Sequence, residues 1–215
     1  MTNAEILSHI DHTVLKQDAK WEDIAQICEE ALQYGTASVC IPSYYVKRAK
    51  TAFPALNVCT VIGFPLGYQP ASVKAFEAAD AVSDGADEID MVINVSAMKN
   101  GEDDVVLDEI RAVRKACEGQ ILKVIIETCC LTDDEKIRCC ELITEAGADF
   151  IKTSTGFGKA GAQLEDIALF RAHIGENVRI KAAGGIRTRE DMEAFLAAGC
   201  DRIGCSAARI LFDEA

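Results

Sequence analysis

The stretch EAGADFIKTSTGFG, residues 145–158, joins the end of a helix to a short strand and a glycine-containing loop. Apolar side chains with helical spacing precede the stretch and stop at Gly147, and glycine is common just past the end of a helix. The same junction recurs in SDGADEI, residues 83–89, and in AAGCDRI, residues 197–203. Three copies of one helix-to-strand junction indicate a chain built from repeated β/α units.

Short apolar runs supply the strands of these units. Seven runs lie at residues 38–41, 58–63, 88–94, 122–127, 150–155, 179–184 and 202–206, and HIDHTVL at residues 9–15 provides an eighth. We therefore predict an α/β protein with one domain over residues 1–215, a single (β/α)8 TIM barrel with a short N-terminal helix. An open, doubly wound sheet is the structural alternative, because the alternation of strands and helices does not prove closure.

Composition restricts the function and the compartment. The net charge of −13 argues against nucleic acid or an anionic membrane as a partner. No apolar run is long enough to span a membrane and the N-terminus lacks signal-peptide features, so we expect a cytoplasmic protein. The ten cysteines are scattered, which favours a reduced compartment. The pairs at 129–130 and 139–140 lack zinc-site spacing, so we expect no metal.

Side-chain alternation separates the two faces of each strand. In EIDMVIN, residues 88–94, Ile89 and Met91 share an apolar face, which leaves Asp90 on the other face. The apolar face of a barrel strand packs on helices, so Asp90 is expected to point into the barrel. The same alternation points Lys152 and Lys181 inward on successive strands. It also places four further residues inside: Asp11, Thr13, Cys40 and Glu127.

Two inward lysines have two interpretations. In the first, Lys152 and Lys181 are merely ion-paired with Asp90 and Glu127 in a buried network. In the second, Lys152 attacks a carbonyl and forms a Schiff base, which requires a neutral amine. Desolvation and the neighbouring ammonium of Lys181 both favour the neutral amine, and Asp90 can move protons. Two lysines beside an inward carboxylate favour this second interpretation.

Three loops of small residues follow the last three predicted strands. They are STGFGKAG at 154–161, AAGGIRT at 182–188 and IGCSAAR at 203–209. Phosphate sites of TIM barrels commonly use these loops together with a helix N-terminus. Glycines in a single loop often do no more than turn the chain, but three neighbouring loops predict an anion site. Its expected members are Gly156, Gly184, Gly185, Gly204 and Ser206.

Five motifs resemble the deoxyribose-phosphate aldolase family. They are IDHTVLKQD, VIGFPLG, EIDMVINV, IKTSTGFG and KAAGGIRT, and the resemblance covers residues 8–208. It implies reversible cleavage of 2-deoxy-D-ribose 5-phosphate to D-glyceraldehyde 3-phosphate and acetaldehyde, a lyase reaction of deoxyribonucleotide catabolism. It also implies that Lys152 forms the Schiff base, that Lys181 activates it and that Asp90 transfers protons.

The resemblance extends to the remaining site residues and to the assembly. It implies a phosphosugar and acetaldehyde as the small-molecule partners, no metal or organic cofactor, and a homo-oligomer, either a dimer or a tetramer. Gly156, Gly184, Gly185 and Ser206 would hold the phosphate. Positions near the family's substrate are matched by Asp11, Thr13 and Cys40.

Two departures from the family pattern and two alternative functions remain. Ala207 stands where many members have a phosphate-binding hydroxyl, so we expect weaker phosphate binding or compensation by Arg209 or Lys159. The sequence ends in ILFDEA, without the terminal tyrosine that assists proton transfer in some members. Another Schiff-base aldolase or a transaldolase would share the lysine and the barrel. A non-catalytic phosphosugar-binding barrel would keep the pocket without turnover.

Overall fold

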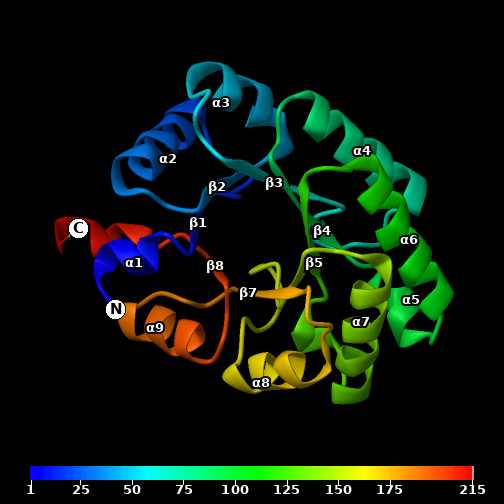
Figure 1. The fold of residues 1–215 in the computed structure, drawn as a ribbon. Coiled ribbons are helices and arrows are strands. Elements are labelled where there is room, and N and C mark those ends of the chain that lie inside the picture. Colours follow the sequence, from blue (N-terminus) through cyan, green and yellow to red (C-terminus); the bar gives the residue numbers. More distant parts are fainter. Residues whose placement is uncertain (215) are drawn as a thin grey trace.

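The computed structural model describes residues 1–214, which form a closed barrel of eight parallel strands with helices around it (Figure 1). The strands are β1 (Ile10–Thr13), β2 (Ser38–Ile41), β3 (Val58–Ile62), β4 (Glu88–Val92), β5 (Ile121–Ile125), β6 (Phe150–Lys152), β7 (Arg179–Ala183) and β8 (Arg202–Cys205). Pairing between β1 and β8 closes the sheet, so the predicted TIM barrel is confirmed and the open sheet is excluded.

The helices lie outside the strands (Figure 1). They are α1 (Asn3–Leu7), α2 (Trp21–Tyr34), α3 (Val46–Ala52), α4 (Ala71–Ser83), α5 (Val95–Lys99), α6 (Asp103–Ala116), α7 (Asp133–Ala146), α8 (Leu164–His173) and α9 (Arg189–Ala197). Three short 3₁₀ helices are η1 (Ser43–Tyr45), η2 (Thr128–Cys130) and η3 (Ala208–Glu214). In the described residues, no helix is long and apolar enough to cross a membrane.

The repeated junction of the sequence sets the register between neighbouring strands. Its aspartates are Asp87, Asp149 and Asp201, and each carboxylate accepts a hydrogen bond of 2.8 or 2.9 Å from the backbone near the start of the preceding strand. The residue whose backbone N–H donates to the carboxylate also accepts, at its own carbonyl, a hydrogen bond from the backbone N–H of the aspartate. The three partners are Val58, Leu122 and Ile180. Each junction therefore ties the start of one strand to the start of the one before it.

Local signals explain where the helix before β6 begins and ends. Thr132 caps α7 by accepting from the backbone of Glu135, whose side chain accepts from the backbone of Thr132. Gly147 ends the helix with φ 72°, a conformation that favours glycine. The strand then begins at Phe150, so this one segment contains a complete β/α junction.

The two faces of the strands differ in character as predicted. Ile89 and Met91 of β4 are fully buried in the core that the strands form with the surrounding helices. The opposite face carries Glu88 and Asp90, which are equally buried but lie inside the barrel. The predicted N-terminal helix is present as α1, which lies beside η3 (Figure 1), and Asn3 donates to the carbonyl of Leu211 at 2.9 Å. The barrel is therefore apolar outside its sheet and highly charged within it.

Candidate active site

The structure brings together the three side chains predicted to be catalytic. Lys152 is the last residue of β6, and it lies directly across from Lys181 of β7 in the strand register. One carboxylate oxygen of Asp90, Oδ2, lies 2.6 Å from Nζ of Lys152 and 2.6 Å from Nζ of Lys181. Asp90 and Lys181 are fully buried, whereas Lys152 retains 3% of its exposure. A single carboxylate thus bridges the two lysines.

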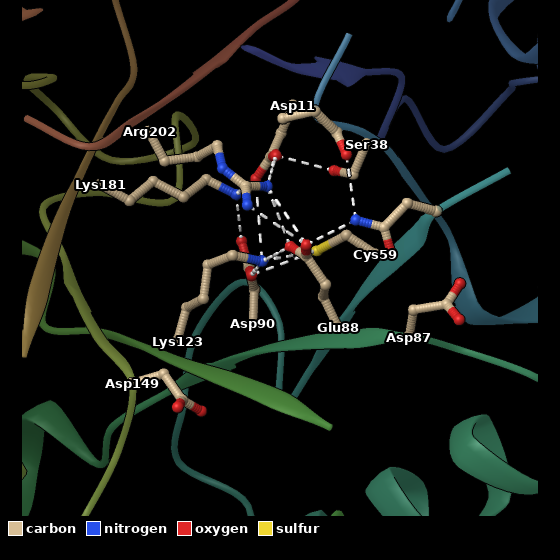
Figure 2. Close-up of polar contacts among 12 residues, drawn as sticks. Asp11, Ser38, Cys59, Asp87, Glu88, Asp90, Lys123, Asp149, Lys181 and Arg202 are labelled. Carbon is tan, nitrogen blue, oxygen red and sulfur yellow. Dashed lines mark hydrogen bonds and ion pairs between the residues drawn. The ribbon is translucent and has the colours of Figure 1, made fainter. Parts of the chain in front are cut away.

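A third interior lysine, Lys123, was missed by the sequence reasoning. It lies on β5 beside Asp90, and its Nζ is 2.9 Å from Asp90 Oδ1 and 3.4 Å from the sulfur of Cys59. It also forms an ion pair with Glu88 (Figure 2). The alternation that assigned Glu127 to the interior assigns Lys123 to the same face, four residues earlier. This signal was sufficient to find the residue.

Asp11 lies inside the barrel, as alternation predicted. Its carboxylate forms ion pairs with Lys181 and Arg202, and it accepts a hydrogen bond of 2.7 Å from the hydroxyl of Ser38 (Figure 2). Arg202 also pairs with Glu88 at 3.1 Å. Asp11 is fully buried, both of its oxygens have partners and it does not line the cavity described below. It is positioned to stabilise Lys181, and its place near the substrate stays a prediction.

Electrostatics favour the charged forms of Asp90 and Lys181. Burial raises the pKa of Asp90, but Lys123, Lys152 and Lys181 together hold it well below its usual value. Burial lowers the pKa of Lys181, yet attraction to Asp11 and Asp90 outweighs this effect and raises it. The ion-paired groups of the interior are three carboxylates (Asp11, Glu88, Asp90) and four cations (Lys123, Lys152, Lys181, Arg202). The network therefore carries one positive charge in excess.

A cavity of about 690 Å³ lies at the end of the barrel where the strands finish, and Lys152 reaches into it. It is lined by six of the residues predicted to contact substrate: Thr13, Gly156, Gly184, Gly185, Gly204 and Ser206. A second hollow of about 560 Å³ between Trp21 and α3 contains none of the predicted site residues. The first cavity is therefore the candidate active site.

The glycine loops approach one another closely at the rim of this cavity. Gly184 has φ 89°, and a Cβ added to Gly161 would lie only 2.2 Å from the carbonyl oxygen of Gly184. Side chains are excluded from both positions, and the backbone of the two loops forms this wall of the cavity. Such exposed backbone is suited to an anion, provided that its N–H groups face the ligand.

The loop after β8 differs from the expectation. Ser206 is exposed and lines the cavity, but it precedes a 3₁₀ helix, η3, rather than an α-helix. Arg209 also lines the cavity, and its Nε donates to Glu30 at 2.8 Å, so this guanidinium is partly committed to an ion pair. Compensation for Ala207 by Arg209 would have to use its remaining donors.

Of two further predicted site residues, Thr13 lines the cavity and Cys40 does not. Thr13 lines it, and its hydroxyl donates to the carbonyl of Asp11 at 2.7 Å. Cys40 is only 1% exposed and packs with Cys59 and Val61. Cys40 therefore does not line the cavity, although it lies across from Thr13 in the strand register, and its place near the substrate stays a prediction.

Two groups of acidic and thiol side chains approach metal-ligand spacing. They are Cys40, Cys59 and Asp90, and Asp11, Cys59 and Glu88. Lys123 contacts members of both groups and Lys181 contacts an aspartate in each. The ammonium groups thus already supply the positive charge that a metal ion would bring.

Known proteins are similar to this chain over nearly its whole length. A model of the DeoC/LacD family of aldolases matches residues 6–206. The deoxyribose-phosphate aldolase of Clostridium botulinum (strain Eklund 17B / Type B) is 57% identical over 209 residues, covering 97% of this chain and 95% of the relative. That of Clostridioides difficile (strain 630) is 53% identical over 211 residues, covering 97% and 96%.

A solved structure extends the similarity to three dimensions. The tetrameric deoxyribose phosphate aldolase from Aeropyrum pernix superposes with a TM-score of 0.91 at 30% identity, covering 99% of this chain and 91% of that one. Family model, relatives and structure thus agree over nearly the whole chain. The chain belongs to the DeoC/LacD family of aldolases.

Proposed function

We propose that the protein reversibly cleaves 2-deoxy-D-ribose 5-phosphate to D-glyceraldehyde 3-phosphate and acetaldehyde through a Schiff base on Lys152. The proposal rests on one observation: Oδ2 of Asp90 lies 2.6 Å from Nζ of both Lys152 and Lys181. Lys152 also lines the cavity that the glycine loops enclose. The names of the relatives that match over nearly the full chain support the choice of substrate.

Charge balance supports Lys152 as the nucleophile. Loss of one proton would cancel the excess positive charge of the interior network. Lys123 contacts three carboxylates and Lys181 contacts two, but Lys152 contacts only Asp90 among the described residues. Lys152 thus has the fewest carboxylate partners of the three lysines, and it alone of the three lines the cavity. Lys152 is the amine best placed to attack a carbonyl.

The remaining steps follow from the chemistry of an imine. The amine of Lys152 adds to C1 of the open-chain sugar and water leaves, which gives a protonated imine. Breaking the C2–C3 bond sends its electron pair toward the imine nitrogen, while the C3 hydroxyl loses a proton to Asp90 or to a water held by it. Protonation of C2 and hydrolysis then release acetaldehyde. The imine accepts the electrons, so the proposed reaction needs no metal or organic cofactor.

Lys181 would serve as a fixed positive charge in this sequence. Its raised pKa keeps it an ammonium, so it stabilises the carboxylate of Asp90. Asp11 holds Lys181 in place from below. The phosphate would bind at the loops that contain Gly156, Gly184 and Gly185, which line the cavity.

Borohydride trapping tests the proposal directly. The protein is incubated with acetaldehyde or deoxyribose 5-phosphate, reduced, digested and examined by mass spectrometry. We expect one adduct on Lys152, and Lys152→Ala should abolish turnover while the circular dichroism spectrum is retained. A folded Lys152→Ala variant with full activity would refute the assignment. Phosphosugar binding without adduct or product would instead favour the non-catalytic phosphosugar-binding barrel.

We also propose that the protein works in the cytoplasm as a homo-oligomer, a dimer or a tetramer. The tetrameric relative from Aeropyrum pernix supports self-association. Two large apolar side chains of α4, Val73 and Phe76, are 49% and 72% exposed, and such surface is often covered in assemblies. Light scattering on the purified protein would give the mass in solution, and a monomer at micromolar concentration would contradict this proposal.

A further inference from the structure

Glu127 is a buried carboxylate that the proposed reaction does not use. Within residues 1–214, it is the one non-glycine residue whose φ lies in the left-handed region, at 53°. Such a conformation is unfavourable for a side chain with a Cβ and persists only where surrounding contacts hold it. Its side chain is 7% exposed, so solvent does not explain the conformation. The contacts of Glu127 should therefore reveal its role.

The backbone around Glu127 forms a bulge against the neighbouring segment. Ile126 donates to the carbonyl of Lys152 at 3.1 Å, and Thr128 donates to the carbonyl of Thr153 at 2.9 Å. The chain advances by two residues from Ile126 to Thr128 but by only one residue from Lys152 to Thr153. Glu127 is therefore the extra, bulged residue. Bulges of this kind redirect a side chain. Here the side chain contacts Thr155, in the loop after β6.

The carboxylate of Glu127 holds Thr155 at two points. It accepts a short hydrogen bond from the hydroxyl of Thr155, and Oε1 accepts from the backbone N–H of Thr155 at 3.3 Å. The hydroxyl oxygen of Thr155 accepts in turn from the backbone N–H of Phe157 at 3.0 Å. A hydroxyl has one proton to donate, and that of Thr155 is directed to Glu127. Thr155 is therefore oriented by Glu127 and does not offer its proton to a ligand.

The same loop passes directly over Glu127. A Cβ added to Gly158 would lie 3.1 Å from Oε1 of Glu127, so the backbone of the loop is in close contact with the carboxylate. Thr155, Gly156 and Phe157 line the active-site cavity together with Lys152. A carboxylate beside a loop expected to bind phosphate repels the phosphate and lowers its affinity. The presence of Glu127 here therefore indicates a role that offsets this repulsion.

We propose that Glu127 is a positioning residue that, through Thr155, holds the loop of Gly156 in the shape that recognises the substrate's phosphate. It would thereby set the preference for a phosphorylated over a non-phosphorylated sugar. This inference rests on the proposed function for the identity of the sugar. It assigns Glu127 no part in the chemistry at Lys152.

Four variants separate positioning from a structural role. Glu127→Gly removes the carboxylate and also permits the left-handed backbone, so folding is favoured. Glu127→Gln keeps an acceptor for the hydroxyl of Thr155. Thr155→Val removes that hydroxyl, and Thr155→Ser restores it. Glu118→Gly, at an exposed position before β5, is the matched control.

The readout is kcat/KM for deoxyribose 5-phosphate divided by kcat/KM for deoxyribose. We expect Glu127→Gly and Thr155→Val to lower this ratio by about tenfold, as for loss of one net hydrogen bond, mainly through the KM of the phosphosugar. Glu127→Gln, Thr155→Ser and Glu118→Gly should stay within about threefold of the wild type. Equal losses on both sugars, or an unchanged ratio in Glu127→Gly, would overturn the proposal.

A measurement without turnover distinguishes this inference from the proposed function. Calorimetric titration with inorganic phosphate alone should show weaker binding to Glu127→Gly than to wild type or Glu118→Gly. Borohydride trapping of acetaldehyde on Lys152 should be unchanged in Glu127→Gly. Failed trapping in the wild type would refute the Schiff-base reaction only, whereas equal phosphate affinity in Glu127→Gly and wild type would refute the role of Glu127 only.

Discussion

The ion pair between Lys74 and Glu109 should be essential to stability although it lies outside the active site. The two side chains are 0% and 2% exposed, and Lys74 Nζ lies 2.6 Å from Glu109 Oε2 and 2.8 Å from the carbonyl of Val92. Glu109 Oε1 accepts from the backbone of Asn94 at 2.6 Å. The pair thus joins α4 and α6 to the end of β4, the strand that carries Asp90.

Lys74→Met should lower the free energy of unfolding by about 3–5 kcal/mol, because it leaves the carboxylate of Glu109 buried without its cation. Methionine fills most of the same volume, so a cavity contributes little. For a chain of this size the loss corresponds to a fall in Tm of about 6–20 °C. Urea unfolding followed by circular dichroism at pH 7 measures it.

The pH dependence of this loss has a defined sign. Burial raises the pKa of Glu109 and lowers that of Lys74, and removing Lys74 deprives Glu109 of its cation. A carboxyl whose pKa is raised on folding favours the folded state below its unfolded pKa of about 4.3 and loses this contribution as pH rises. The penalty of Lys74→Met should therefore be smaller at pH 5 than at pH 7.5.

Two further variants control the experiment. Adding Glu109→Gln to Lys74→Met removes the unpaired charge and should recover about half of the loss. Lys47→Met breaks an exposed pair, since Lys47 is 78% exposed and lies 3.2 Å from Asp84, and should change stability by less than about 1 kcal/mol. The reasoning is refuted if Lys74→Met is no more destabilising than Lys47→Met, or if the double variant is no more stable than Lys74→Met alone.

Three other outcomes are expected. Asp11 and Asp90 have pKa values below those of aspartate in the unfolded chain. The free energy of unfolding should therefore fall as pH drops below about 4. Urea titrations that give the same free energy from pH 6 to 2.5 would contradict this. Asp201→Ala should cost about 1–2 kcal/mol in urea unfolding by leaving the N–H of Ile180 unpaired, whereas Asp201→Asn should retain most of the stability. Gly161→Ala should raise the KM for the phosphosugar by about tenfold, because its Cβ would lie 2.2 Å from a backbone oxygen, and steady-state kinetics with an unchanged KM would contradict it.

Sequence reasoning succeeded where a local pattern has one physical meaning. The junction ending in Asp149 predicted a helix end and a strand start, and both are found. Alternation predicted that Asp90, Lys152 and Lys181 share the interior, and the structure joins all three through Oδ2 of Asp90. Their assigned roles in the reaction stay predictions until the trapping experiment is done.

The same reasoning failed where depth along a strand mattered. Alternation states which face a side chain takes but not how far it lies from the end of the barrel. Alternation predicted that Asp11 and Cys40 point inward, but only the structure shows that neither of them lines the cavity. Glu127 was expected among the lysines, but a bulge turns it toward Thr155. No local pattern in the sequence predicts that bulge.

The sequence alone determined the β/α repeat, the closed barrel's strand count and the inward face of each strand, because these follow from periodicity and from short junction motifs. Only the tertiary structure decided how the interior charges are shared among Lys123, Lys152 and Lys181. Ion pairing depends on distances between side chains on strands that are far apart in the sequence. The residue types on each strand do not fix these distances. For this reason the partners of Lys152, unlike the fold, could be read only from the closed barrel.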